Sequence, residues 1–209
     1  MKKILLSLFA LLVISTLHAQ NNLSSVKIDD QTWMAKNLDV DHYRNGDPIP
    51  QVTDGTAWAN LTTGAWCYYN NDLTQGKTYG KLYNWFAVND PRGLAPAGWH
   101  IPGDAEWTTL EKSLGGSLVA GGKMKEEGTL HWATPNTKAD NNSGWAALPG
   151  GSRFVNGFFG GIGENGVWWN SSESNTEIAL MRIMSFNDGR LVKSTAYKYY
   201  GYSVRCVRH

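Results

Sequence analysis

The side chains that most often carry catalysis or bind metals are scattered along this chain without a recognised spacing. No His-Glu-x-x-His pattern and no nucleophile-elbow motif is present. His100 directly follows Trp99, and we interpret it as a structural histidine. We therefore expect neither a catalytic residue nor a histidine-bound metal. The histidines that lie beyond residue 19 are His42, His100, His131 and His209.

Several glutamates could supply the pair of carboxylates that cleaves a glycosidic bond. The sequence brings no two of them together, and most glutamates in proteins are exposed. Glu106 stands three residues after Gly103, so its carboxylate can reach back to the Gly103 amide as half of a capping box. We therefore assign Glu106 a structural role as a helix cap. The candidates are Glu106, Glu126, Glu127, Glu164, Glu173 and Glu177.

Aromatic rings are the more distinctive chemistry of this chain. Its 209 residues include ten tryptophans and 23 glycines, which indicates many turns and large aromatic anchors. Most rings must belong to the core. The adjacent pairs Tyr68-Tyr69 and Trp168-Trp169 stand on expected strands, where alternation directs one ring inward and its neighbour outward. We take both pairs, with Trp145, as candidate ligand-binding residues on which a sugar or a protein would stack.

The stretch 98–116 organises the elements around these residues. Pro102 prevents a helix before it, and three apolar residues at i, i+3 and i+7 then form one stripe. We expect a buried loop, seated by Trp99 and Pro102, that leads into a short helix anchored by Trp107. The stripe consists of Trp107, Leu110 and Leu114.

A second short helix is expected over 79–88, where two aromatic and apolar pairs stand at i, i+4. Hairpins are expected over 26–34 and 179–193, the second with a turn at Asn187-Asp188-Gly189. The last strand, 202–208, alternates, with Val and Cys facing inward and the arginines facing outward. No regular element is expected over 41–60. Other strands are expected within 65–69, 144–154 and 166–172.

The first nineteen residues have the pattern of a secretory signal peptide. Lys2-Lys3 precedes an apolar run over 4–17, and Ala19 allows cleavage after it. The run is short for a membrane span. We expect a chain exported to the periplasm, the cell surface or the extracellular space, with one domain over 20–209. Loss of the two lysines changes the formal charge from +1 to −1, which offers nothing to recruit nucleic acid.

Export changes the interpretation of the only two cysteines, Cys67 and Cys206. An oxidising compartment favours a disulfide between them. Such a bridge would enclose most of the domain and stabilise it by up to about 5 kcal/mol in the loop-entropy model. Two reduced, buried cysteines are the alternative. Cysteines this far apart form no zinc-binding pattern.

Six stretches carry a further signal: Gln31–Leu38, Tyr79–Trp85, Gly98–Pro102 with Ala105–Trp107, Leu148–Gly151, Trp168–Glu173 and Gly201–Arg208. In this order they resemble the Fibrobacter succinogenes major paralogous domain family. They cover nearly all of the expected domain. The family usually has Thr or Ser where this chain has Gly103.

A more distant resemblance links Ile101–Trp107, Gly150-Gly151-Ser152 and Val204-Arg205-Cys206 to formylglycine-generating and C-type-lectin-like domains. It implies an α+β fold in which two short helices pack on twisted antiparallel strands. The N- and C-terminal strands would be adjacent, and long ordered loops would lie on one face.

The same resemblance bears on chemistry. The formylglycine-generating oxidase needs two nearby reactive cysteines to hold copper, and here Cys206 is the only cysteine in the C-terminal half. Lectin-like domains often bind calcium through loop oxygens, which Asp140-Asn141-Asn142 and Asn170 with Glu173 could supply. Such clusters are more often turns. We expect no cofactor, with calcium as the alternative.

These features together predict a non-enzymatic binding module, exported and without a membrane span in the mature chain. Its ligand would be a glycan or an extracellular protein, bound through aromatic and loop surfaces, and nucleic acid is not an expected partner. A relative of the formylglycine-generating oxidase and a purely structural extracellular component are the alternatives.

Overall fold

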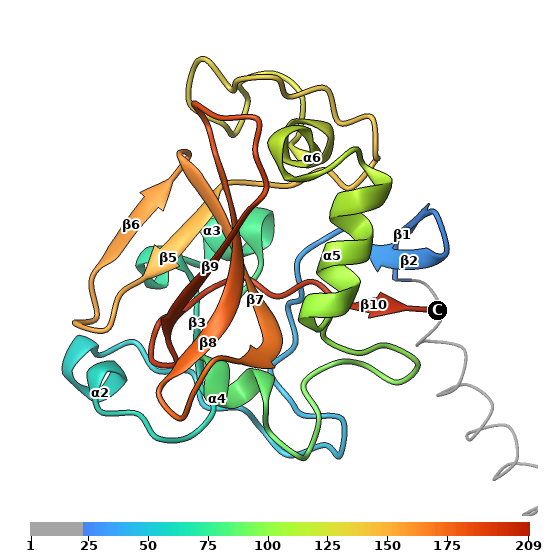
Figure 1. Cartoon of the computed structure of the whole chain (residues 1–209). Helices are drawn as coiled ribbons and strands as arrows, with labels where there is room; N and C mark the ends of the chain where they lie inside the picture. Colours follow the sequence, from blue (N-terminus) through green and yellow to red (C-terminus); the bar gives the residue numbers. More distant parts are fainter. Residues whose placement is uncertain (1–22) are drawn as a thin grey trace, which may run out of the picture.

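The computed structural model describes residues 23–209, and the predicted signal peptide at 1–19 lies outside the described residues. Over this range the chain forms four small antiparallel sheets and several short helices (Figure 1). The architecture is α+β, as predicted. Among residues 23–209, no helix combines the length and the apolar character that crossing a membrane requires.

The longest strands form one three-stranded sheet of order β7-β8-β9. β8 and β9 are antiparallel, with Ile183 opposite Val192, which confirms the predicted hairpin over 179–193. Helix α5 runs beside this sheet and contacts β7 (Figure 1). The bounds are β7 Asn165–Glu173, β8 Ile178–Ser185 and β9 Val192–Tyr197.

The two ends of the described chain meet in a second three-stranded sheet of order β1-β2-β10. β1 and β2 form the predicted N-terminal hairpin, and its turn places Asp29 at a φ of 53°. Trp33 of β2 pairs with Val207 of β10, so the terminal strands are adjacent, as the resemblance implied. The bounds are β1 Ser25–Ile28, β2 Gln31–Met34 and β10 Val207–Arg208.

Helix α5 spans Asp104–Ser113 and confirms the helix predicted after Pro102. The Glu106 carboxylate accepts a hydrogen bond from the Gly103 amide at 2.8 Å, which is the predicted half of a capping box. Trp107 is fully buried. The local signals of a cap and an apolar stripe therefore correctly positioned this helix.

The continuous helix predicted over 79–88 does not form, and after Gly80 only its last four residues are helical, as α4 at Trp85–Val88. α3, at Leu73–Tyr79, ends at Gly80, whose φ of 76° lies outside the helical region. β4, at Leu82–Tyr83, then pairs with β3, at Trp66–Cys67. Three residues of the apolar pairs, Tyr79, Leu82 and Tyr83, are buried, but the glycine and the strand pairing override their helical spacing.

The remaining elements are short and lie among long ordered loops. A helical turn forms within 41–60, where none was predicted, because the Asp54 side chain accepts a hydrogen bond from the Ala57 amide at 2.7 Å. These elements are α2 Gly55–Ala59, the 3-10 turn Tyr69–Asn71, α4 Trp85–Val88, α6 Ser117–Met124, β5 Gly150–Arg153 and β6 Phe159–Ile162.

Of the strand predicted over 202–208, only Val207–Arg208 forms as β10, and one of the arginines predicted to face outward points inward. Arg208 is exposed, as predicted, but Arg205 is only 1% exposed. Its guanidinium lies 3.6 Å from the centroid of the Trp145 ring and donates hydrogen bonds to the Trp145 carbonyl and to Asn37 Oδ1. The aromatic face and these acceptors compensate for burial of the charge, which simple alternation does not anticipate.

Candidate functional site

The tryptophans predicted to form a binding surface belong to the core. Trp145, Trp168 and Trp169 are all fully buried. Alternation does send Trp168 and Trp169 in opposite directions, but a separate hydrophobic cluster covers each face of β7. Their indole nitrogens donate at 2.8 Å to Asn37 Oδ1 and to the Tyr83 carbonyl, respectively. The prediction of an exposed ring in this pair is therefore wrong.

In the Tyr68-Tyr69 pair one ring is buried and the other partly exposed, although the predicted strand ends at Cys67 and Tyr69 begins a 3-10 turn. Tyr69 is buried and packs on Phe159, with 5.3 Å between ring centroids. Tyr68 is half-buried and lies edge-on to Trp66, with the Lys81 ammonium 5.1 Å from its centroid. Of the five predicted ligand-binding residues, Tyr68 alone keeps an appreciable exposed surface.

The predicted disulfide is also wrong, because Cys67 and Cys206 are both free and fully buried. Cys67 packs in the cluster of Trp58, whereas Cys206 packs in the cluster of Trp169. Burial raises the pKa of the Cys67 thiol to about 11 and that of Cys206 to about 12. Both thiols therefore stay protonated and serve as small core side chains.

The oxygen-rich stretches considered for calcium are occupied by local interactions. Asp140 accepts a hydrogen bond from the Asn142 amide at 3.0 Å, as in a turn. Asn170 is fully buried. Glu173 pairs with the Lys198 ammonium at 2.6 Å. These contacts use the carboxylates on which the calcium alternative depends.

The residues predicted to seat the loop before α5 lie where they were expected. Trp99 is 6% exposed, and the guanidinium of Arg208 stacks 4.7 Å from its ring centroid. Pro102 is buried, and its carbonyl accepts a hydrogen bond from the Ser171 amide at 3.0 Å. Together these contacts join the loop to both the C-terminal strand and β7.

An aromatic groove, defined here by its lining residues, lies along the edge strand β9. It encloses about 290 Å³, which is close to the small end of ligand-site volumes. Tyr197 is 48% exposed, Tyr200 is half-buried, and Tyr202 forms the buried floor. The groove is lined by Ile178, Thr195, Ala196, Tyr197, Tyr200 and Tyr202.

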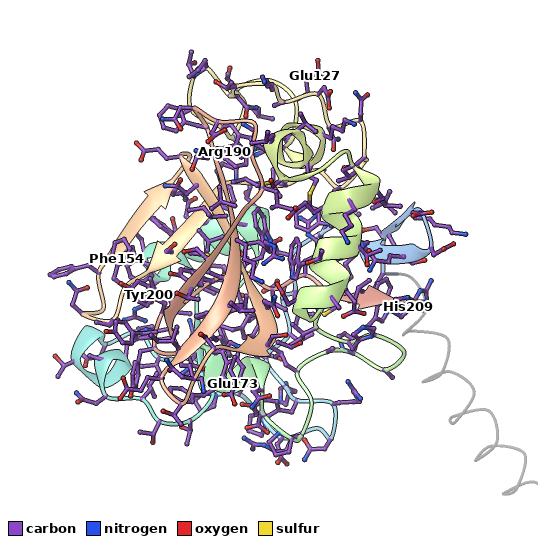
Figure 2. All side chains as sticks on the ribbon, in the orientation of Figure 1. Glu127, Phe154, Glu173, Arg190, Tyr200 and His209 are labelled. Atoms are coloured by element: carbon purple, nitrogen blue, oxygen red, sulfur yellow. The ribbon has the colours of Figure 1, made fainter. Side chains whose placement is uncertain are left out.

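A continuous set of rings connects the aromatic groove to the core. Trp169 contacts Tyr202 with centroids 4.5 Å apart, and Tyr202 stacks on Tyr200 at 5.5 Å with 29° between their planes. Tyr200 and Phe154 pack in a T-shaped arrangement with centroids 5.9 Å apart, and both lie on the same side of the molecule (Figure 2). Phe154 is 38% exposed. The exposed rings are thus held by buried ones.

The sequence did not single out this groove, although a signal for it exists. Residues 197–200 read Tyr-Lys-Tyr-Tyr. Lys198 is buried, with its ammonium 4.4 Å from the centroid of the Trp85 ring, and Tyr199 packs edge-on to Phe86 at 5.5 Å. With Lys198 anchored in this way, Tyr197 and Tyr200 stay on the surface.

A second group, the His–Glu cluster, consists of His100, Glu106 and His209 at the start of α5. His100 Nε2 and His209 Nε2 both approach Glu106 Oε1, the latter at 3.0 Å. Burial acts to raise the pKa of Glu106, but hydrogen bonds from His100, the Gly103 amide and His209 hold it below its ordinary value. Glu106 is therefore an ionised carboxylate that both caps α5 and receives two imidazoles.

Comparison with known proteins places nearly all of the described chain in one family. A family model described as the Fibrobacter succinogenes major domain matches residues 26–208. No curated protein sequence and no solved structure matches the chain.

Proposed function

The chain belongs to the Fibrobacter succinogenes major domain family, and from this starting point we propose that it is a non-enzymatic carbohydrate-binding module. Its ligand would stack on Tyr197 and Tyr200 in the aromatic groove. The observation that carries the proposal is a groove lined by two partly exposed tyrosines, of which Tyr200 packs on the buried rings of Tyr202 and Trp169.

The chemistry of the lining suits a sugar. A pyranose presents an apolar C–H face that packs on an aromatic ring, while its hydroxyls need polar partners at the rim. Tyr197 and Tyr200 offer ring faces together with phenolic hydroxyls, and Thr195 adds an aliphatic hydroxyl. The groove, at about 290 Å³, suits a small ligand portion such as part of a glycan.

Pre-organisation supports the same proposal. Tyr200 packs against both Tyr202 and Phe154, so little side-chain freedom remains to be lost when a ligand binds. A ring that is already ordered contributes more net affinity than one that must be fixed on binding.

We propose a C-type-lectin-like arrangement, supported by the pairing of the terminal strands in β2 and β10 and by the long ordered loops. We also propose export by the predicted signal peptide, which would place the groove where extracellular or periplasmic glycans are met. The protonated, buried state of Cys67 and Cys206 favours a binding module over the formylglycine-generating oxidase.

A glycan and polysaccharide array tests the proposal, with wild type compared with Tyr197→Ala and Tyr200→Ala. Each variant should weaken binding by about tenfold or more, which corresponds to about 1.4 kcal/mol. Tyr200→Phe should retain most of the binding, because it keeps the ring. The matched control is Tyr199→Ala, a half-buried neighbour that does not line the groove.

Two results would count against a carbohydrate ligand in this groove. One is an array without saturable binding by the folded wild type, which would favour a protein ligand or a structural role. The other is binding that Tyr199→Ala reduces as much as Tyr200→Ala does.

A further inference from the structure

We propose that His100, Glu106 and His209 form a binding site for a zinc ion. The site is separate from the aromatic groove and does not depend on the proposed carbohydrate function. Figure 2 shows His209 and the Phe154–Tyr200 pair on opposite sides of the molecule.

The ligand atoms already converge. One nitrogen from each histidine and one oxygen from the glutamate all lie within 4.8 Å of one another. A tetrahedral zinc ion with bonds of 2.0–2.1 Å separates its ligand atoms by about 3.3 Å. Because His209 Nε2 is now 3.0 Å from Glu106 Oε1, small side-chain rotations are enough to admit the ion.

The backbone holds the three residues in place from different directions. His100 and Val207 exchange two backbone hydrogen bonds, at 3.0 and 2.9 Å, which fixes the start of the loop next to β10. His209 follows β10 directly. Glu106 stands in the first turn of α5, a ten-residue helix. Zinc would therefore connect segments that the fold has already brought together.

The carboxylate is oriented for this role. Glu106 Oε2 accepts the Gly103 amide at 2.8 Å, which leaves Oε1 directed at both imidazoles. A hydrogen bond to the second oxygen of a ligating carboxylate is the kind of outer contact that orients metal ligands.

The donor set selects the type of metal. Two imidazole nitrogens and one carboxylate oxygen suit zinc and other first-row transition metals, whereas calcium and magnesium take six or more oxygen ligands. The side chains of His100 and His209 are 45% and 62% exposed. The fourth position therefore faces solvent and would be filled by water.

Isothermal titration of tag-free protein with zinc chloride tests the proposal. We expect one saturable site per chain, weakened at least about tenfold in His209→Ala and in Glu106→Gln. His209→Ala is the decisive variant, because this side chain is 62% exposed and its loss should disturb the fold least. Zinc should also raise the melting temperature of wild type, and this shift should be lost in His209→Ala.

His131→Ala is the matched control. His131 Nδ1 also pairs with a glutamate, Glu126, at 2.7 Å, but within residues 23–209 no third histidine, cysteine or carboxylate joins that pair. This variant should bind zinc as wild type does, and millimolar calcium should not compete. Absence of a saturable site in wild type would overturn the proposal. So would binding that His209→Ala leaves undiminished or that His131→Ala abolishes.

Discussion

Cys67 and Cys206 each pack in a hydrophobic cluster, where burial raises the pKa of both thiols. A thiol reagent reacts with the thiolate and needs access to it. We therefore expect two thiols to be titrated when the protein is unfolded without reductant, and essentially none in the native protein over the same time. Unfolded protein with no reactive thiol would instead show that the two cysteines are bridged.

Asp90 and Arg92 form a bidentate ion pair, in which Nε and Nη2 of the arginine each lie 2.8 Å from a carboxylate oxygen of Asp90. The hydrogen bond from Arg92 lowers the pKa of Asp90 from its ordinary value of 3.8. Because the folded-state pKa is the lower one, the stabilisation is present above the ordinary pKa and is lost as pH falls through the folded-state value.

Urea unfolding across pH tests this ion pair. Asp90→Asn should be less stable than wild type at neutral pH, and the two free energies of unfolding should converge as pH falls below 3.8. A difference that stays constant into the acid range would show that the charge of Asp90 is not responsible.

At the scale of elements, α5 has an incomplete N-cap that can be improved. Gly103 has a φ of −82°, and a Cβ placed there would come no closer than 3.6 Å to a neighbouring atom, Ser172 Oγ. Gly103→Ser should therefore raise the free energy of unfolding by about 0.5–1 kcal/mol, through the added cap and a less flexible unfolded chain.

Gly116→Ser is the matched control for that substitution. Gly116 is the N-cap of α6, but its φ of 92° lies in the region that favours glycine. This variant should be destabilised when both are measured by the same urea unfolding. If the two substitutions changed stability equally, the capping explanation would be wrong.

Trp107 anchors α5 between two other tryptophans, with ring centroids 4.9 Å from Trp33 and 5.9 Å from Trp145. Because it is fully buried, Trp107→Ala should lower the free energy of unfolding by about 3–5 kcal/mol. Thr109→Ala, on the exposed face of the same helix, should change it by no more than about 0.5 kcal/mol. An equally stable Trp107→Ala variant would contradict the anchoring role.

Local signals explain which elements could be predicted. The N-terminal hairpin followed from its turn residues, and α5 followed from a cap and an apolar stripe. Each of these signals is contained in a stretch of about fifteen residues. The segment 79–88 differs, because its strand β4 pairs with Trp66 and Cys67 of β3. The spacing of apolar residues within 79–88 carries no information about this partner strand. Tertiary pairing decided the outcome there.

At the scale of the whole molecule, the candidate sites depend on contacts that a sequence pattern does not contain. Trp168 and Trp169 were predicted to expose a ring, since one covered face per sheet is usual, but here both faces of β7 are covered. Glu106 and His209 are 103 residues apart and meet only because β10 pairs beside the loop of His100. The α+β class was predictable, whereas these juxtapositions were not.

The fold thus separates two surfaces. The aromatic groove is formed by β9 and the turn that follows it, whereas the His–Glu cluster is formed by α5 and the end of β10. Their positions on opposite sides in Figure 2 mean that a ligand in one leaves the other open. Variants of one surface should therefore not affect binding at the other.

The most direct test of the proposed function is nuclear magnetic resonance on protein with isotope-labelled tyrosine, titrated with the oligosaccharide that binds best on the array. We predict saturable shifts of the ring signals of Tyr197 and Tyr200, with nuclear Overhauser contacts from sugar C–H protons to these two rings. The Tyr199 ring should not contact the sugar. Saturable binding with contacts only to other rings, or with no change at Tyr197 and Tyr200, would contradict a carbohydrate site in the aromatic groove.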